Sequence, residues 1–231
     1  MLPRLEDLAG SGPGVAALAG GRLTGFLLSR IVVPRVERMA WVPDCGHGLA
    51  RPGDGVTCRR MYADISRRWA AEGCCAQAVS IQAYDRDAVE AWFSLGFGLT
   101  WVDALRDLEP AAGEDEGVEI RRAGPDDIDV LVHLEAELVR HLTSAPISLV
   151  YPEDPETHAR RSWADGPVDT TWIAFRDDRA VGYLTAERPG ADAPVMARTG
   201  QSTASVGGAY VVEDARNRGV GTALLNRSLE K

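Results

Sequence analysis

One stretch near the end of the chain constrains the fold most: residues 209–225 read AYVVEDARNRGVGTALL. An apolar β-branched run precedes RNRGVG and leucines at helical spacing follow it, which predicts a strand, a glycine-containing loop and a helix. The first N–H groups of a helix lack partners within it and carry partial positive charge. Gly219 and Gly221 give a phosphate room to approach, and Arg216 and Arg218 add charge that pairs with phosphate oxygens. The stretch therefore predicts a phosphate-binding loop.

A strand, the motif R-x-x-G-x-G and an amphipathic helix in this order resemble the acyl-CoA pyrophosphate loop of the GCN5-related N-acetyltransferases (the GNAT family). Other phosphate loops fit poorly, because there is no Gly-Lys-Ser/Thr and no G-x-G-x-x-G near the start of a βαβ unit. A glycine-rich turn that caps an ordinary helix is the alternative. The resemblance implies acetyl-CoA as co-substrate, held by Val211, Val212, Arg216, Asn217, Arg218, Gly219, Val220, Gly221 and Thr222.

Composition argues against several classes of partner. The chain has 231 residues, of which 45% are apolar and 26% charged, with a net charge of −9, whereas nucleic acids and anionic membranes call for basic surfaces. No apolar run approaches the ~20 residues that span a bilayer, and residues 1–30 lack the segments of a signal peptide, so we expect a cytoplasmic protein. The four cysteines form no C-x-x-C pair, and we expect reduced packing residues and no metal site.

The two halves of the chain repeat each other. Residues 15–28, VAALAGGRLTGFLL, lie over residues 172–185, WIAFRDDRAVGYLT, and each segment predicts a β-hairpin with its turn in the same place. The matched pairs are Ala17 with Ala174, Arg22 with Arg179, Gly25 with Gly182, Phe26 with Tyr183, and Leu27 with Leu184. Two generic hairpins are the alternative, but the shared Arg-x-x-Gly-aromatic-Leu favours common ancestry.

We therefore predict an α/β protein of two acetyltransferase-like modules, each a mixed, mostly antiparallel sheet flanked by helices. Residues 1–108 form the first module, 109–117 (EPAAGEDEG) the linker, and 118–231 the acetyl-CoA-binding module. The first resembles the C-terminal part of such a module and the second the N-terminal part. We accordingly expect a fragment of a longer tandem protein, with contact between its modules, and leave a homodimer open.

Local patterns predict the remaining elements. In the first half we expect a short helix within 1–13, a strand over 36–49, a loop at 51–55, a helix over 58–72, a strand over 76–83, a helix over 85–95 and a strand over 99–105. In the second half we expect a strand over 118–122, a helix from 124 to about 142, a helix near 157–163, a hairpin over 170–187 and a loop over 188–201.

The first half departs from the family pattern in two places. Its loop, RPGDG at 51–55, is one residue short of R-x-x-G-x-G; Pro52 removes an N–H and Asp54 puts a carboxylate where phosphate would lie. Trp92 stands where the resemblance places a thiolate-protonating tyrosine, and indole cannot act as that acid. We expect a structural module that binds no CoA, and we interpret His47 as a turn residue.

Few side chains of the second half fit a catalytic base. The strand before the loop has no acid, and Glu213 and Asp214 come after it, where they more naturally cap or face water. His133 and His141 fall on the polar side of their helix and do not share the i, i+4 spacing of a zinc pair. These residues are therefore interpreted as structural or solvent-facing.

Glu135 is the one acid on the apolar face of the helix at 126–142, where residues advance by about 100° each. A carboxylate facing the sheet must be paired or protonated. The resemblance places the acceptor beside this helix, so Glu135 is the candidate catalytic residue, holding an acceptor ammonium or taking its proton through water. The alternatives are a structural pair with an arginine such as Arg179, or a helix that turns so that the acid reaches solvent.

The expected function is N-acetylation, with an acetyl group passing from acetyl-CoA to an amine of a small molecule or protein. The rival hypothesis is a non-catalytic acyl-CoA-binding or assembly protein built from acetyltransferase-like modules. By the resemblance, the general acid is expected in a Y-x-x-x-G-F-like segment beyond Lys231. The acceptor is left open, because its pocket is formed by variable helices and loops.

Overall fold

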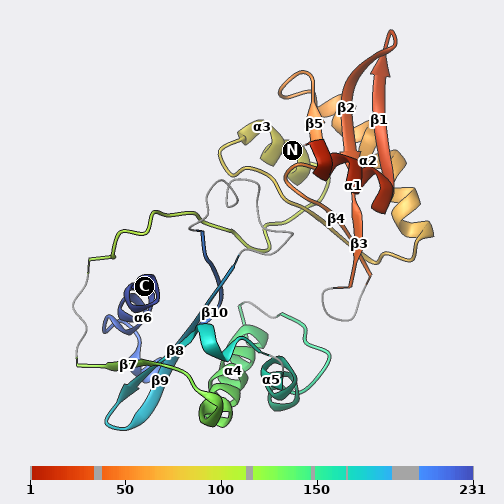
Figure 1. The fold of residues 1–231 in the computed structure, drawn as a ribbon. Helices are drawn as coiled ribbons and strands as arrows, with labels where there is room; N and C mark the ends of the chain where they lie inside the picture. Colours follow the sequence, from red (N-terminus) through yellow and green to blue (C-terminus); the bar gives the residue numbers. More distant parts are fainter. Residues whose placement is uncertain are drawn as a thin grey trace. The chain divides into compact units, whose positions relative to one another are not determined.

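The computed structural model describes residues 2–33, 38–112, 117–146, 149–164, 166–188 and 203–230, and every structural statement below refers to them. These residues divide into a first unit, up to Ala104, and a second unit, from Leu105 on (Figure 1). Each unit is a mixed α/β structure with its own hydrophobic core. The predicted fold class is therefore confirmed.

The first unit contains two small sheets and three helices (Figure 1). One antiparallel sheet has the order β1-β2-β5 and the other has the order β3-β4-β6, in which β4 and β6 run parallel. The elements are α1 (Leu2–Ser11), β1 (Gly14–Ala19), β2 (Arg22–Leu28), β3 (Arg30–Val32), β4 (Met39–Val42), β5 (His47–Leu49), α2 (Gly55–Ala71), β6 (Ala76–Val79) and α3 (Arg86–Phe93). α2 packs on β1 and β2 through the predicted apolar face, which includes Met61, Ile65 and Trp69.

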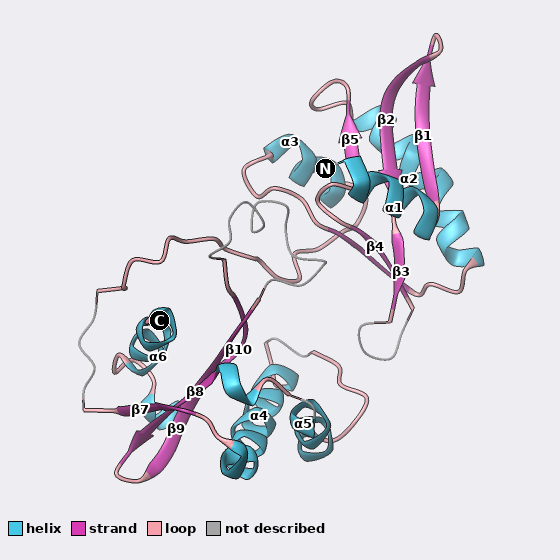
Figure 2. Cartoon of the chain, in the orientation of Figure 1, coloured by secondary structure: helices cyan, strands magenta, loops and turns pink. Residues whose placement is uncertain are grey.

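Three predictions for the first unit need correction. The strand expected over 36–49 is two strands, β4 and β5, because the chain turns at Pro43, whose carbonyl accepts the Gly46 N–H at 2.8 Å. The helix expected from 58 begins at Gly55, because Asp54 caps it. The strand expected over 99–105 is absent from the described residues, which form a loop there (Figure 2). Trp101 and Val102 are both exposed although they are adjacent, so neither face of a strand is buried there.

The second unit is one antiparallel sheet covered by helices on both faces. The strand order is β10-β9-β8-β7, with α4 and α5 on one face and α6 on the other (Figure 1). The elements are β7 (Glu119–Arg122), α4 (Ile128–Thr143), α5 (Pro155–Ala164), β8 (Thr171–Arg176), β9 (Arg179–Glu187), β10 (Ser205–Val211) and α6 (Val220–Leu229). The predicted elements of this half are confirmed, and the loop predicted over 188–201 lies almost wholly outside the described residues.

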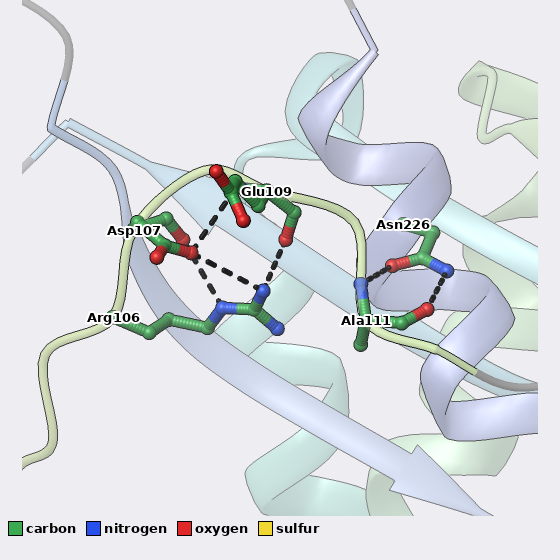
Figure 3. Close-up of polar contacts among 5 residues, drawn as sticks. All are labelled: Arg106, Asp107, Glu109, Ala111 and Asn226. Carbon is green, nitrogen blue, oxygen red and sulfur yellow. Dashed lines mark hydrogen bonds and ion pairs between the residues drawn. The ribbon is translucent and has the colours of Figure 1, made fainter.

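The segment that leads toward β7 is held against α6 (Figure 3). The side-chain amide of Asn226 accepts the Ala111 N–H at 2.7 Å and donates to the Ala111 carbonyl at 2.9 Å. Arg106 donates to the carbonyl oxygens of Asp107 and Glu109, which folds the preceding residues back on themselves. The start of the predicted linker is thus bound to α6, whereas residues 113–116 lie outside the described residues.

The two hairpins that repeat in sequence also share their geometry. Ala17 pairs with Gly25 and Ala174 with Gly182, and the register of each hairpin shifts directly after that alanine. Both turns hold two residues with positive φ, at 20–21 and at 177–178, as a tight hairpin requires. The correspondence therefore extends to an irregularity that two unrelated hairpins would not be expected to share.

The matched glycines, Gly25 and Gly182, both stand where an added Cβ would be crowded. A Cβ on Gly182 would lie 2.7 Å from the Tyr210 carbonyl oxygen and 3.4 Å from Leu224 of α6. A Cβ on Gly25 would lie 2.9 Å from Met61 of α2. Each glycine thus leaves space that a side chain would fill, at Gly182 for the backbone of the neighbouring strand β10 and at Gly25 for the Met61 side chain of α2.

We expect Gly182→Ala to destabilise the protein by about 1–3 kcal/mol, because the added methyl group overlaps a backbone oxygen that the sheet holds in place. Equilibrium urea unfolding measures the change. Gly98→Ala is the control: nothing lies within 4 Å of its added Cβ, so it should stay within about 1 kcal/mol of wild type. Equal stability of the two variants would contradict the close approach of the Tyr210 carbonyl of β10 to Gly182 of β9.

Candidate functional site

The loop between β10 and α6 is shaped by left-handed residues and anchored by buried ones. Asn217 has φ +59° and Gly219, the residue before α6, has φ +77°. Ala215 and Val220 are buried on either side. A positive φ is readily adopted by glycine and tolerated by asparagine. The sequence therefore sets both the turn and the point where α6 begins.

The start of α6 is open. Among the described residues no side chain caps this helix, and its first internal hydrogen bond is donated by Ala223 to the Gly219 carbonyl at 2.9 Å. The N–H groups of Val220, Gly221 and Thr222 precede that bond and lack partners within the helix. A Cβ on exposed Gly221 would meet only Val211, at 3.9 Å. Internal packing does not call for glycine at this position, so its small size keeps the space outside the helix free.

The corresponding helix of the first unit, α2, is closed by its own side chain. Asp54 accepts the Thr57 N–H at 3.0 Å and the Thr57 hydroxyl at 2.7 Å. The bond from the Thr57 N–H is the main cause that lowers the pKa of Asp54. A carboxylate therefore occupies the place where an anionic ligand would bind, as the sequence suggested.

The first loop is shorter than the sequence motif indicated. Leu49 pairs with the hairpin glycine Gly25, as Val211 pairs with Gly182. The helix cap follows five positions later in the first unit, from 49 to 54, and eight positions later in the second, from 211 to 219. The first loop thus lacks three residues rather than one. Comparison of RPGDG with R-x-x-G-x-G underestimated the difference in length, because the residue at which each loop begins is defined by the pairing of the strands.

Two other residues singled out in the first unit are structural. Trp92 is 3% exposed, with its ring centroid 4.9 Å from that of Phe97. His47, interpreted from the sequence as a turn residue, is instead the first residue of strand β5, where it pairs with Leu27 and contacts the Ser80 carbonyl through Nε2 at 2.9 Å. Each side chain therefore ties parts of the first unit together.

The two arginines of the second loop differ in orientation. Arg216 donates from Nε to the Val211 carbonyl at 2.9 Å, and its guanidinium lies 5.5 Å from the centroid of the Tyr210 ring. Arg218 and Asn217 are exposed beside the open end of α6. Arg216 thus fixes the loop to the strand, which the sequence did not predict, whereas Arg218 extends the positive region at the surface.

The end of β10 offers backbone groups on its outer edge. The Val212 N–H donates to the Val181 carbonyl at 3.0 Å, so it is used within the sheet. Backbone groups alternate in direction along a strand, which turns the N–H of Val211 to the other edge. β10 is the last strand in the sheet order, and Val211 therefore carries the N–H that a ligand along this edge can reach.

An open recess of about 130 Å³ lies where β9, β10 and the start of α6 meet. Its lining consists of Tyr183, Leu184, Ala209, Tyr210, Val211, Gly221 and Leu224. Burial is the main cause that raises the pKa of Tyr210, and the charge of Arg216 opposes the shift. The recess joins the open helix end to the strand edge, and it is mostly apolar.

Glu135 lies on the sheet-facing side of α4, as its position in the sequence predicted. It is half-buried and accepts a hydrogen bond from the hydroxyl of Tyr183 on β9. The arginine suggested as its partner, Arg179, instead pairs with Asp214 at 2.6 Å on the surface. That alternative is wrong, because the hairpin turn carries Arg179 away to the 3-10 turn at Glu213–Ala215.

Tyr183 is the residue that sequence reasoning missed. Its side chain is 1% exposed, and burial raises the pKa of its hydroxyl well above the ordinary value, with a further rise from the charge of Glu135. The one available signal was its match to Phe26 in the repeat, which showed an added hydroxyl in the second half. Asn226, which holds the linker segment, gave no sequence signal.

The remaining candidates stay outside the site. His133 and His141 are exposed, as predicted, and Glu213 and Asp214 are exposed too. No group of three or more His, Cys, Asp or Glu side chains in the described part of the chain is arranged to hold a metal ion. Within the same residues, no helix combines the length and apolar character needed to cross a membrane.

Comparison with known proteins points to one family. Residues 136–231 match the model of the acetyltransferase (GNAT) family. No curated protein sequence matches the chain. One solved structure, a GCN5-related glucosamine N-acetyltransferase region of a fungal multi-domain β-N-acetylglucosaminidase, is 15% identical with a TM-score of 0.55; the match covers 96% of this chain and 29% of that one. At this identity the likeness shows the fold.

Two further solved structures match about half of the chain. The aminoglycoside N-acetyltransferase AAC(6')-Iy in complex with CoA is 17% identical with a TM-score of 0.38, over 46% of this chain and 84% of that one. An acetyltransferase from Clostridium acetobutylicum with acetyl-CoA is 16% identical with a TM-score of 0.36, over 49% and 71%.

The shifted pKa of Tyr183 predicts a pH dependence of stability. An ordinary phenol ionises near pH 10, whereas buried Tyr183 keeps its proton, so its contribution is complete below about pH 10 and is lost as pH rises further. The free energy of unfolding should fall by about 1.4 kcal/mol per pH unit more in wild type than in Tyr183→Phe above that pH. Urea unfolding between pH 8 and 11 measures both slopes.

Tyr84→Phe is the control for this measurement, because Tyr84 is 76% exposed. It should keep the wild-type slope. Identical slopes for wild type and Tyr183→Phe would contradict the burial of the Tyr183 hydroxyl against Glu135.

Proposed function

We propose that the chain transfers an acetyl group from acetyl-CoA to an amine, with CoA bound by the second unit; the match of residues 136–231 to the acetyltransferase (GNAT) family model supports this. The observation that carries the proposal is the open start of α6, which lies beside the recess at the edge of β10. The same position in the first unit is filled by Asp54.

The described residues fit the parts of CoA. The N–H groups of residues 220–222 lack partners within the helix at its positive end and suit the pyrophosphate, and exposed Arg218 adds charge. The outward N–H of Val211 suits an amide of the pantetheine arm. The recess of about 130 Å³ is smaller than a typical ligand pocket, so it suits one narrow segment of the molecule. These assignments make 211–222 the acyl-CoA site.

Bound acetyl-CoA supplies an activated thioester, whose carbonyl carbon a neutral amine attacks as the CoA sulfur leaves. The protein has to hold the two reactants at contact distance and receive the proton of the amine. Glu135 is the carboxylate in position for the acceptor, because it lies on the inner side of α4 and bonds to a residue that lines the recess. We assign it the role of binding the acceptor ammonium or taking up its proton.

The first unit is proposed to be a duplicated module that has lost CoA binding. Its hairpin keeps the register, the irregularity and the glycine of the second unit. Its loop is three residues shorter and Asp54 occupies the helix end. The preserved scaffold with a closed site supports a structural role. Contact between the modules and formation of a homodimer stay predictions.

We expect Gly221→Glu to weaken CoA binding by the full chain at least tenfold in calorimetric titration. The new carboxylate would stand at the anion site, and each lost charge-assisted contact is worth about 1.5–3 kcal/mol. The fold should survive, because the neighbouring Val211 leaves room for the added Cβ.

Gly55→Glu is the matched control, at the start of α2, where nothing lies within 4 Å of the added Cβ. It should bind CoA as wild type does. Equal CoA affinity of wild type and Gly221→Glu would contradict the assignment of this loop to the CoA site. Release of CoA thiol from acetyl-CoA with a panel of primary amines then tests catalysis; binding without turnover would favour the non-catalytic acyl-CoA-binding protein instead.

A further inference from the structure

The recess and the acceptor-side carboxylate are joined by one side chain. Tyr183 lines the recess, and its hydroxyl donates to Oε2 of Glu135 on α4. The side chain is 1% exposed: Gly208 of β10 leaves room for the hydroxyl, since an added Cβ there would lie 3.2 Å from it, and the Trp163 ring of α5 lies 5.9 Å from the Tyr183 ring. Tyr183 is therefore a buried donor that holds one oxygen of the Glu135 carboxylate.

A phenol is an unusual partner for an acid that faces a sheet. An arginine would neutralise the carboxylate, whereas a neutral hydroxyl satisfies one oxygen and leaves the negative charge in place. The raised pKa of Tyr183 keeps this hydroxyl protonated. The described arginines of α4 and α5 pair with other acids: Arg140 with Glu137 and Glu156, Arg160 with Asp129, and Arg161 with Glu153. None of these three arginines pairs with Glu135, so its carboxylate is available to a cationic ligand.

The repeat shows that the fold does not need this hydroxyl. Phe26 occupies the matched position in the first unit, in a hairpin of the same register and with the same irregularity. The hydroxyl therefore occurs in the unit whose helix end is open and is absent from the unit whose helix end Asp54 fills. The hydroxyl is thus associated with the open helix end and not with the hairpin geometry that both units share.

We propose that Tyr183 is a positioning residue: it fixes the Glu135 carboxylate, still charged, so that the other oxygen binds the ammonium group of the acceptor. The assignment rests on the proposed function and narrows the acceptor to amines that arrive as cations. Half-buried Glu135 retains access to solvent, which leaves a path for such a group.

The experiment uses n-butylammonium as the probe and the uncharged 1-butanol as its comparison. The indole N–H signal of Trp163 in the full chain is followed by nuclear magnetic resonance, because this ring lies 5.9 Å from that of Tyr183. Wild type should show a saturable shift with n-butylammonium and none with 1-butanol. Glu135→Gln should abolish the shift, and Tyr183→Phe should raise the Kd about fivefold or more.

Tyr62→Phe is the control for loss of a bonded tyrosine hydroxyl, because Tyr62 bonds to Gln77 in the first unit; it should leave the Kd unchanged. An unsaturable shift in wild type, or an equal Kd in Tyr183→Phe, would overturn the proposal. If Tyr183→Phe fails to fold, wild-type affinity in Glu135→Gln overturns it as well. Titration of CoA by calorimetry is independent of this result, so a protein that binds the ammonium but not CoA would refute the proposed function alone.

Discussion

The first N–H groups of a helix have no partners within the helix. The two units differ in how these groups are treated. At α2 the carboxylate of Asp54 accepts from Thr57 and closes the helix. At α6 no described side chain does so, and Gly221 leaves the space outside the helix free. An anion bound there would gain hydrogen bonds and a favourable dipole without displacing any part of the protein. The proposed CoA site depends on this difference.

The scaffold around the two helix ends has changed less than the ends themselves. Gly25 and Gly182 occupy matched positions where an added Cβ would be crowded, by Met61 of α2 at Gly25 and by the Tyr210 carbonyl of β10 at Gly182. Against this shared background the second unit has a longer loop and the hydroxyl of Tyr183. The two units thus share a scaffold and differ at a few positions around the helix end. This pattern supports the proposal that the first unit is a duplicated module that has lost CoA binding.

Much of the fold was predictable because local rules and tertiary structure agree. Alternating apolar residues around turn-forming pairs gave both hairpins, and helical periodicity placed Glu135 on the inner side of α4. The prediction of a strand over 99–105 was wrong, because a sequence pattern does not reveal whether a neighbouring strand is present to pair with it. The partner of Glu135 was missed because Tyr183 is 48 residues away in sequence. Arg216 was expected to face a ligand, but it satisfies the carbonyl of Val211.

The central claim is that CoA binds at the open helix end and not at the closed one. Assigned backbone amide spectra of the full chain, recorded as CoA is added, test it directly. The account predicts saturable shifts at Gly219, Val220, Gly221 and Thr222, because the N–H groups at this helix end would donate to the phosphate oxygens of CoA, and unchanged signals at 54–57, where Asp54 already fills the end of α2. Shifts at 54–57, or none at 219–222, would contradict it.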